Sequence, residues 1–205
     1  MSTNRRLALA IKRLMDIVLS AIVLLLTALP MLVIALAVKL TSPGPIFFVQ
    51  ERVGKDKRLF NVVKFRTMRD KMSDESHHRW TANDEERVTS IGYFLRDYGL
   101  DELPQTLSII RGDMSIIGPR PILPSQIDGL SERETLMFQM RPGVLSLAAI
   151  RGRRGLSLKQ RYEYHVQYVE QWSLRLDITI LFKSLLIVLR REKARDTVPG
   201  TDMKS

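Results

Sequence analysis

The stretch LMDIVLSAIVLLLTALPMLVIALAVKL, residues 14–40, decides how this chain is organised. No charged residue occurs among the 22 residues from Ile17 to Val38. A straight α-helix of that length is about 33 Å long, enough to cross the ~30 Å hydrocarbon core of a bilayer. The run is too long for the apolar part of a cleaved signal peptide, and no small-residue cleavage site follows it. We therefore predict a membrane helix within residues 1–40.

Pro30 lies in the middle of this run. It predicts a bend near residues 26–30, because proline removes a helical hydrogen bond and clashes with the preceding turn. We expect Thr27 to satisfy a carbonyl that the proline frees. Basic residues, which favour the cytoplasmic face, flank the run on both sides; they are Arg5, Arg6, Lys12 and Arg13 before it and Lys39, Arg52, Lys55, Lys57 and Arg58 after it. The residues alone leave two topologies open: a bent helix that enters and leaves on one face, and a spanning helix that tolerates a proline.

The composition narrows the class of protein. Of the 205 residues, 45% are hydrophobic and 26% are charged, which excludes global disorder. The chain has no cysteine, which excludes disulfides, thiolate metal sites and cysteine nucleophiles. Lys and Arg outnumber Asp and Glu by 32 to 22, and a formal charge of +10 favours anionic partners such as nucleic acid, anionic lipid or phosphorylated substrates.

The rest of the chain reads as a mixed domain. IFFVQ (46–50) and LFNVVKF (59–65) predict two strands of a β-hairpin around a polar turn. Residues 70–86 predict a polar surface loop, where His77 and His78 favour solvent over a metal because no spaced ligand accompanies them. We expect helices within 89–99, 131–140 and 162–195.

The apolar stretch Leu174–Leu189 is interrupted by Arg175, Asp177 and Lys183. That pattern is typical of a helix that lies in the membrane interface or packs on the domain, and not of one that spans.

Few residues are suited to catalysis. There are three histidines, no Gly-x-Ser-x-Gly elbow, no P-loop and no dinucleotide fingerprint, which leaves carboxylates and arginines. Asp101 and Glu102 directly precede LPQTLSII, a predicted helix in which Pro104 is tolerated. The pair has two interpretations: it caps the helix, or one carboxylate attacks phosphorus while its neighbour holds Mg²⁺.

Two basic features accompany the carboxylate pair. In Pro119-Arg120-Pro121 the prolines restrict the backbone around one arginine, which suits bidentate phosphate binding, although a plain surface turn explains it too. The segment 141–162 contains no acidic residue; its basic residues are Arg141, Arg151, Arg153, Arg154, Lys159 and Arg161.

Four segments together carry a resemblance. They are KRLMDIVLS (12–20), SPGPIFFVQERVGKDKRLFNVVKFRTM (42–68), LRDYGLDELPQTLSIIRGDMSIIGPRP (95–121) and MRPGV (140–144). In this order they resemble the bacterial sugar transferases of the monotopic phosphoglycosyl transferase family, from about Lys12 to about Arg190. The resemblance implies transfer of a phospho-sugar from a UDP-sugar to polyprenyl phosphate, with UMP as the second product.

The resemblance also implies roles for individual residues. Asp101 would be the nucleophile of a covalent, ping-pong mechanism, and Glu102 would assist Mg²⁺ and phosphate, with both carboxylates as metal ligands. The expected substrate-binding residues are Lys64, Arg66, Arg96, Arg120, Arg141 and Arg153, and the basic loop after Arg141 would face UDP.

The implied fold is α+β and mainly helical, with a re-entrant membrane helix broken at Pro30, amphipathic interfacial helices and a small β-hairpin. It divides into an anchor (1–40), a membrane-associated catalytic domain on the cytoplasmic face of the bacterial inner membrane (41–193) and a flexible tail (194–205). The implied partners are a UDP-sugar, polyprenyl phosphate, anionic membrane lipids and a second copy of the chain in a homodimer, with no nucleic acid.

Three departures from the family pattern concern the helix break and the substrate contacts. Leu29 precedes Pro30 where the family often has serine; Ser146 and Ala149 replace a glycine and a glutamine; and His165 replaces an aspartate. The sequence leaves two other functions to consider. His165 and Ala149 favour a non-catalytic scaffold in glycan assembly, whereas the intact Asp101, Glu102 and Arg120 argue against one. A nucleic-acid binder would need aromatic partners that the basic loop lacks.

Overall fold

Helices make up most of the described part of the computed structural model, which covers residues 3–69, 87–152 and 155–189. The expected loop at 70–86 with His77 and His78, the side chain of Arg153 and the expected tail at 194–205 lie outside these residues. The α-helices are α1 (Thr3–Thr41), α2 (Ser90–Asp97), α3 (Gln105–Arg111), α4 (Leu147–Arg151), α5 (Leu158–Glu170) and α6 (Leu174–Leu189). Short 3-10 turns are η1 (Lys55–Lys57), η3 (Leu100–Glu102), η4 (Pro124–Gln126) and η5 (Glu134–Gln139).

The predicted β-hairpin is confirmed. Strands β1 (Phe47–Val53) and β2 (Leu59–Phe65) pair antiparallel, with Phe47 opposite Phe65 and Val53 opposite Leu59. The turn between them places Asp56 and Lys57 at positive φ angles of 54° and 60°. A second pair was not predicted: β3 (Ser115–Ile117) and β4 (Gly143–Leu145) run parallel. The helix expected within 131–140 is instead the 3-10 turn η5.

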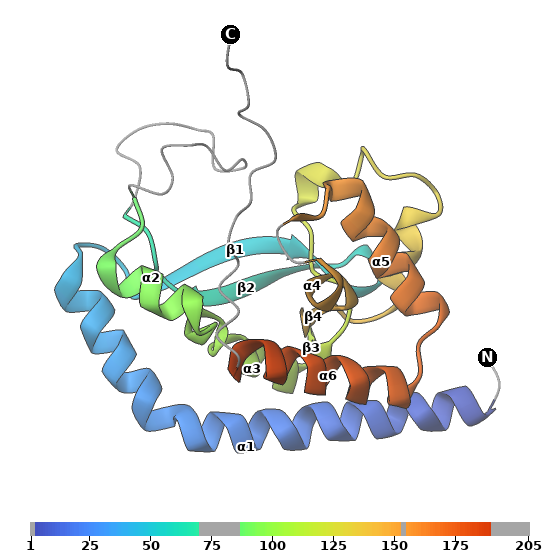
Figure 1. Ribbon diagram of the computed structural model, residues 1–205, viewed down its shortest axis with the longest axis horizontal. Coiled ribbons are helices and arrows are strands. Elements are labelled where there is room, and N and C mark those ends of the chain that lie inside the picture. The colour runs from blue at the N-terminus through green and yellow to red at the C-terminus, as the bar shows by residue number, and fades with distance from the viewer. Residues whose placement is uncertain (1–2, 70–86, 153–154, 190–205) are drawn as a thin grey trace, which may run out of the picture.

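The long apolar helix α1 spans 39 residues and contains Pro30. Figure 1 shows it running along one side of the molecule and changing direction in its second half. Among the described residues it is the one helix long and apolar enough to cross a membrane. The role expected for Thr27 was wrong in detail. Its hydroxyl donates to the carbonyl of Val23 at 2.7 Å, whereas the carbonyl freed by Pro30 is that of Leu26, one turn before the proline. Such back-bonding by threonine itself favours a bend.

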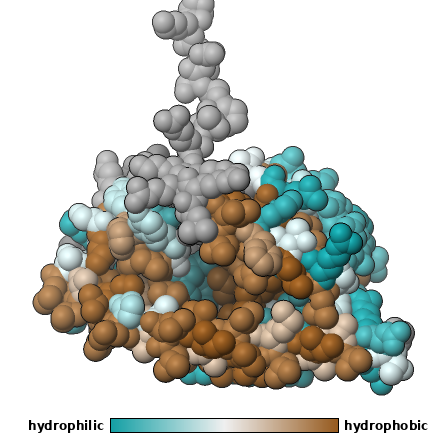
Figure 2. Space-filling view, turned by 60° about the horizontal axis from the view of Figure 1, so that its bottom comes forward, coloured by the Kyte–Doolittle hydropathy of each residue, from teal (hydrophilic) through white to brown (hydrophobic). Residues whose placement is uncertain are grey.

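One face of the molecule is apolar. Figure 2 shows hydrophobic side chains gathered along the side that α1 occupies. Large hydrophobic residues of α1 remain exposed along its length, for example Leu25 at 80% and Leu29 at 70%. Exposed Phe94 of α2, Leu107 of α3 and Phe182 of α6 add to the exposed apolar surface. An exposed apolar surface to which four helices contribute is typical of contact with a membrane or a partner.

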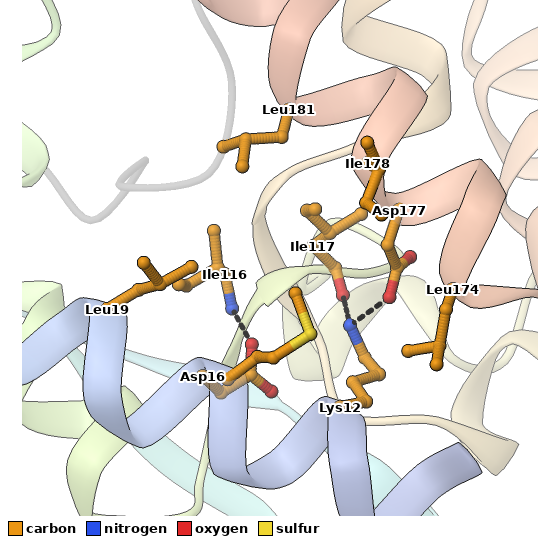
Figure 3. Close-up of a pocket in the computed structure, with 10 residues that line it drawn as sticks. Lys12, Asp16, Leu19, Ile116, Ile117, Leu174, Asp177, Ile178 and Leu181 are labelled. Atoms are coloured by element: carbon orange, nitrogen blue, oxygen red, sulfur yellow. Dashed lines mark hydrogen bonds and ion pairs between the residues drawn. The ribbon is translucent and has the colours of Figure 1, made fainter.

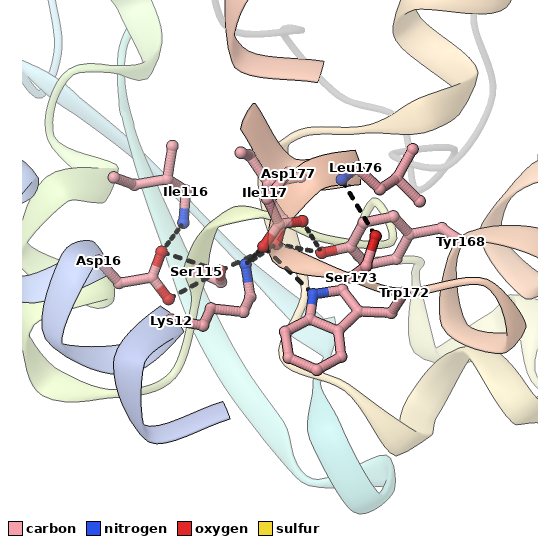
Figure 4. Close-up of polar contacts among 10 residues, drawn as sticks. All are labelled: Lys12, Asp16, Ser115, Ile116, Ile117, Tyr168, Trp172, Ser173, Leu176 and Asp177. Carbon is pink, nitrogen blue, oxygen red and sulfur yellow. Dashed lines mark hydrogen bonds and ion pairs between the residues drawn. The ribbon is translucent and has the colours of Figure 1, made fainter. Parts of the chain in front are cut away.

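The N-terminal half of α1 is fixed to the domain by buried polar residues. Lys12, Asp16 and Ser20 recur every four residues, so they share one face of the helix, and all three are buried. Figure 4 shows the contacts of the first two. The Lys12 ammonium donates to Asp177 of α6 at 2.7 Å and to the Ile117 carbonyl at 2.9 Å. Asp16 accepts from the Ser115 hydroxyl at 2.8 Å and from the Ile116 amide at 3.0 Å.

Asp177 is the most connected member of this cluster. Besides Lys12 it accepts hydrogen bonds from the Tyr168 hydroxyl at 2.7 Å and from the Trp172 indole at 3.2 Å. Burial, and then the Asp177 charge, raise the pKa of Tyr168, so its hydroxyl keeps its proton. Apolar side chains of α1 and α6, including Leu19 and Ile178, line a pocket above the ion pair (Figure 3). The charges are thus taken out of water but remain hydrogen-bonded, as buried ions require.

Substitution of Lys12 by methionine should test this cluster. It removes the cation and leaves the Asp177 carboxylate buried without it, and breaking a buried pair in this way costs about 3–5 kcal/mol. We expect a loss of that size in chemical unfolding in detergent micelles. The matched control is Lys39→Met, because Lys39 makes an exposed contact with the Gly44 carbonyl. Equal unfolding midpoints for the two variants would show that the cluster adds no stability.

Candidate active site

The Asp101–Glu102 pair lies in η3, between α2 and α3. Gly99 ends α2 in the left-handed conformation at φ 67°, a conformation that glycine adopts without strain, and the chain then enters η3. Helix α3 begins only at Gln105, after Pro104, and no side chain caps either η3 or α3. The capping interpretation of the two carboxylates therefore finds no support in the structure.

Glu102 is held by two cations from different elements. Its Oε1 accepts from the Lys64 ammonium of β2 at 2.5 Å and from Nη2 of Arg120 at 2.9 Å. Burial by itself would raise the pKa of Glu102, but the charges and hydrogen bonds of Arg120 and Lys64 outweigh it and lower the pKa to about 2. Glu102 is therefore a carboxylate at any physiological pH.

Asp101 has a different environment. Burial raises the pKa of its carboxyl, and the neighbouring Glu102 charge adds to this effect, while Lys64 and Arg96 oppose it. A raised pKa accompanies a more basic carboxylate. Arg96 comes from the last turn of α2, where its Nε donates to the Thr67 hydroxyl at 2.9 Å.

Arg120 reaches the pair from the segment that follows β3. Its side chain is 53% exposed, and the Glu102 charge raises the pKa of its guanidinium. One nitrogen contacts Glu102, and much of the remaining group faces solvent. The prolines on either side restrict the backbone, as the sequence suggested. This is an accessible and fully charged group beside two carboxylates, suited to binding phosphate.

Two of the other expected substrate-binding residues make backbone contacts elsewhere. Arg66 is 4% exposed; its Nη2 donates to the carbonyl and hydroxyl of Ser42, both at 2.7 Å, directly after the end of α1. Arg141 donates through Nε to the Gly112 carbonyl at 2.7 Å, at the end of α3. Of the described residues expected to bind substrate, the structure thus brings Lys64, Arg96 and Arg120 to the carboxylate pair.

Arg52 also lies next to this site, although it is not among the residues that the sequence predicts to bind substrate. It lies near the end of β1, where Nη1 donates to the Pro121 carbonyl at 3.3 Å and Nη2 to Gln50 Oε1 at 2.5 Å. Burial, and then the charge of Arg120, lower its pKa to about 10. In the sequence Arg52 is one of five basic residues after the membrane helix, and nothing in the pattern separates it from the others.

His165 lies in α5 and is 4% exposed. Its Nδ1 has no hydrogen-bond partner among the described residues. Burial, with smaller contributions from Arg120 and Arg161, lowers its pKa to about 4, so the imidazole is neutral near pH 7. This position therefore contributes no charge of either sign near Arg120.

The two carboxylates fit a magnesium ion that shares its coordination with substrate. No group of three or more His, Cys, Asp or Glu residues gathers in the described ranges, so a site made wholly of protein ligands is not found there. Mg²⁺ is usually held by one or two carboxylates together with substrate phosphates and water. Both cation contacts of Glu102 fall on Oε1, which leaves Oε2 and the Asp101 carboxylate as oxygen ligands.

Comparisons with known proteins identify the family of the chain. Residues 7–191 match the family model described as bacterial sugar transferase. The UDP-glucose:undecaprenyl-phosphate glucose-1-phosphate transferase of Escherichia coli strain K12 is 42% identical over 180 residues, covering 84% of this chain but 39% of that protein. The exopolysaccharide production protein ExoY of Rhizobium meliloti is 35% identical over 188 residues, covering 85% of this chain and 83% of ExoY. An uncharacterized sugar transferase of Bacillus subtilis, EpsL, is 34% identical over 187 residues and 91% of both chains.

The chain spans well under half the length of the Escherichia coli relative, and most of the length of ExoY and EpsL. The matched region includes the whole described domain and nearly all of α1. The match to the family model therefore covers both the carboxylate pair and the basic residues around it. On these grounds the chain belongs to the bacterial sugar transferase family.

Proposed function

We propose that this protein transfers a phospho-sugar from a UDP-sugar to polyprenyl phosphate, giving a polyprenyl-diphosphate-linked sugar and UMP. The observation that carries the proposal is the adjacent carboxylate pair Asp101–Glu102, held among Lys64, Arg96 and Arg120. Relatives named as UDP-glucose:undecaprenyl-phosphate glucose-1-phosphate transferases support this reaction class. The product would begin the assembly of a surface glycan on its lipid carrier.

The first chemical step is assigned to Asp101. A carboxylate oxygen of Asp101 attacks the donor phosphorus that carries the sugar; the bond from this phosphorus to the bridging oxygen breaks, and UMP leaves. The sugar phosphate remains on Asp101 as an acyl phosphate. Burial and the Glu102 charge, which raise the pKa of Asp101, make its carboxylate a better nucleophile.

The second step returns the enzyme to its starting state. An oxygen of polyprenyl phosphate attacks the same phosphorus, the bond to Asp101 breaks, and the carboxylate is restored. Lys64 and Arg120 offset the negative charge that the donor and acceptor bring together. Glu102, kept ionised, orients both cations, and a Mg²⁺ ion held by Asp101 and Glu102 would neutralise phosphate charge.

The contacts of α1 support a re-entrant anchor and a monotopic protein with its domain on the cytoplasmic face. Near its start, Lys12 and Asp16 bond to β3 and α6. At its end, Val38 packs with Phe65 and Leu95, and Arg66 holds Ser42. Both ends of the helix thus contact the same domain. A helix that spanned the bilayer would place its ends on opposite sides, where one domain cannot reach both.

The nucleophile is tested by Asp101→Asn. Asparagine keeps the size of the side chain but is a very poor nucleophile, so turnover should stop while the fold persists. Wild-type protein given the donor alone should release up to about one equivalent of UMP and gain a phospho-sugar on the peptide that contains Asp101, measured by mass spectrometry. Sequential kinetics with an active Asp101→Asn enzyme would refute the covalent mechanism.

The guanidinium of Arg120 is tested by Arg120→Lys. Lysine keeps the charge but loses the planar fork that binds phosphate, so kcat/KM for the donor should fall about 10-fold or more, equivalent to ~1.4 kcal/mol. Arg133→Lys is the matched control. Arg133 is exposed and paired with carboxylates like Arg120, but its partners are Glu163 and Glu170 of α5 and not the carboxylate pair in η3. Equal kinetics for both variants would leave Arg120 without a role in phosphate binding.

The topology is tested with single cysteines in a chain that has none of its own. Asn4→Cys lies near the start of α1 and Lys57→Cys in η1, beyond its end. If the anchor is re-entrant, both should resist a membrane-impermeant thiol reagent in intact cells and react after lysis. Labelling of one position but not the other in intact cells would indicate a spanning helix.

A further inference from the structure

The end of β1 is joined to the segment that carries Arg120. The Val53 amide donates to the Ile122 carbonyl at 2.9 Å, and the adjacent Arg52 side chain donates to the Pro121 carbonyl at 3.3 Å. The two acceptor residues of these bonds, Pro121 and Ile122, directly follow Arg120 in the chain. The bonds hold the guanidinium of Arg52 close enough to Arg120 for the two charges to repel.

This repulsion is not offset at Arg52. Glu102 pairs with Arg120, whereas the described contacts of Arg52 are with neutral oxygens, of Gln50 and Pro121. The buried imidazole of His165, whose pKa is lowered in part by the Arg120 charge, is neutral, so it does not offset the positive charge of the two arginines. Three cationic side chains, Lys64, Arg96 and Arg120, accompany the two carboxylates, and Arg52 adds a fourth positive charge beside Arg120. Two close guanidinium groups with surplus positive charge favour an anion between them.

The backbone between these two arginines is backed by the hydrophobic core. Val53 and Ile122, which form the backbone bond, pack in one cluster with Met137 and Phe138 of η5, and all four side chains are buried. The joint between the end of β1 and the Arg120 segment is therefore a fixed part of the domain.

The position of Arg52 favours a soluble ligand over a lipid. The end of β1 leads into η1, which packs on η5, whereas α1 packs on α3, β3, α2 and β2. In Figure 1 the chain around η5, coloured yellow, lies on the opposite side of the molecule from α1. The apolar face that would meet the membrane is on the α1 side. The lipid phosphate should approach from there.

We infer that Arg52, together with Arg120, binds the phosphate of the donor that leaves as part of UMP. This inference rests on the proposed function and adds a residue to it. By holding the leaving phosphate, Arg52 stabilises the charge that develops on the bridging oxygen as its bond to the sugar-bearing phosphorus breaks.

The test compares the binding of UMP and of uridine, which differ only by the phosphate. Titration calorimetry on the full chain in detergent micelles would give both affinities for the parent protein and for Arg52→Gln, Arg52→Lys and Arg58→Gln. Arg58 lies on the same hairpin and is exposed, so it controls for the loss of one positive charge. We expect Arg52→Gln to lower the ratio of UMP to uridine affinity at least 10-fold, Arg52→Lys to lower it less, and Arg58→Gln to leave it unchanged.

Kinetics separate the two phosphates. The value of kcat/KM for polyprenyl phosphate should stay unchanged in Arg52→Gln, because it reports only the second step of the ping-pong mechanism. An unchanged UMP-to-uridine ratio, or failure of the parent to bind UMP, would overturn the inference, as would a lowered kcat/KM for the lipid with normal UMP binding. A failure of the proposed function would give a different result. The parent protein would then bind UMP through Arg52 but transfer no sugar phosphate, so the anion site would stand and the assigned reaction would not.

Discussion

The buried ion pair between Lys12 and Asp177 is the contact on which the rest of the structure depends. It joins the one long apolar helix to α6, and the same ammonium also holds the carbonyl of Ile117 in β3. Charges removed from water in this way are stable only when their hydrogen bonds are complete, and Tyr168 and Trp172 supply the remaining donors to Asp177. The cluster therefore fixes the position of α1 relative to the domain, because a shift of the helix would leave buried charges unpaired.

From this cluster a short covalent path leads to the proposed catalytic residues. Strand β3 ends at Ile117, and Gly118 and Pro119 then lead to Arg120. At Gly118 a Cβ atom would lie 2.3 Å from the Arg141 carbonyl oxygen, and at Gly143 it would lie 2.0 Å from the Gly118 amide nitrogen. Only glycine permits this approach, which lets the Gly143 amide bond to the Pro119 carbonyl at 2.8 Å. The backbone that presents Arg120 is thus held on one side by α1 and on the other by β4.

The sequence predicted those parts of the fold whose signals are local. The hairpin has two apolar runs around a polar turn, and the uncharged run to Val38 marks the long apolar helix, so both could be recognised from the pattern. The β3–β4 pair could not, because three-residue strands carry too little periodicity. Lys12 and Asp16 read as the charged edge of an apolar run, and only the fold shows that they face β3. The family resemblance implies that Arg66 binds substrate, and only the fold shows that its guanidinium also contacts Ser42 at the end of α1. A side chain's partner is a tertiary property, and one chain's residue order does not encode it locally.

The two adjacent carboxylates illustrate the same limit in their chemistry. Asp101 and Glu102 are neighbours in the chain, and nothing in the sequence alone tells which of them is the more basic. In the fold, Glu102 lies between Lys64 and Arg120 and its pKa falls to about 2, whereas burial raises that of Asp101. Environments that push two pKa values apart divide the work of a carboxylate pair. The permanently ionised member is suited to holding cations in place, and the more basic member is suited to attacking phosphorus. The family resemblance assigned the same roles on motif grounds, and the electrostatics of the described side chains provide an independent physical reason for that assignment.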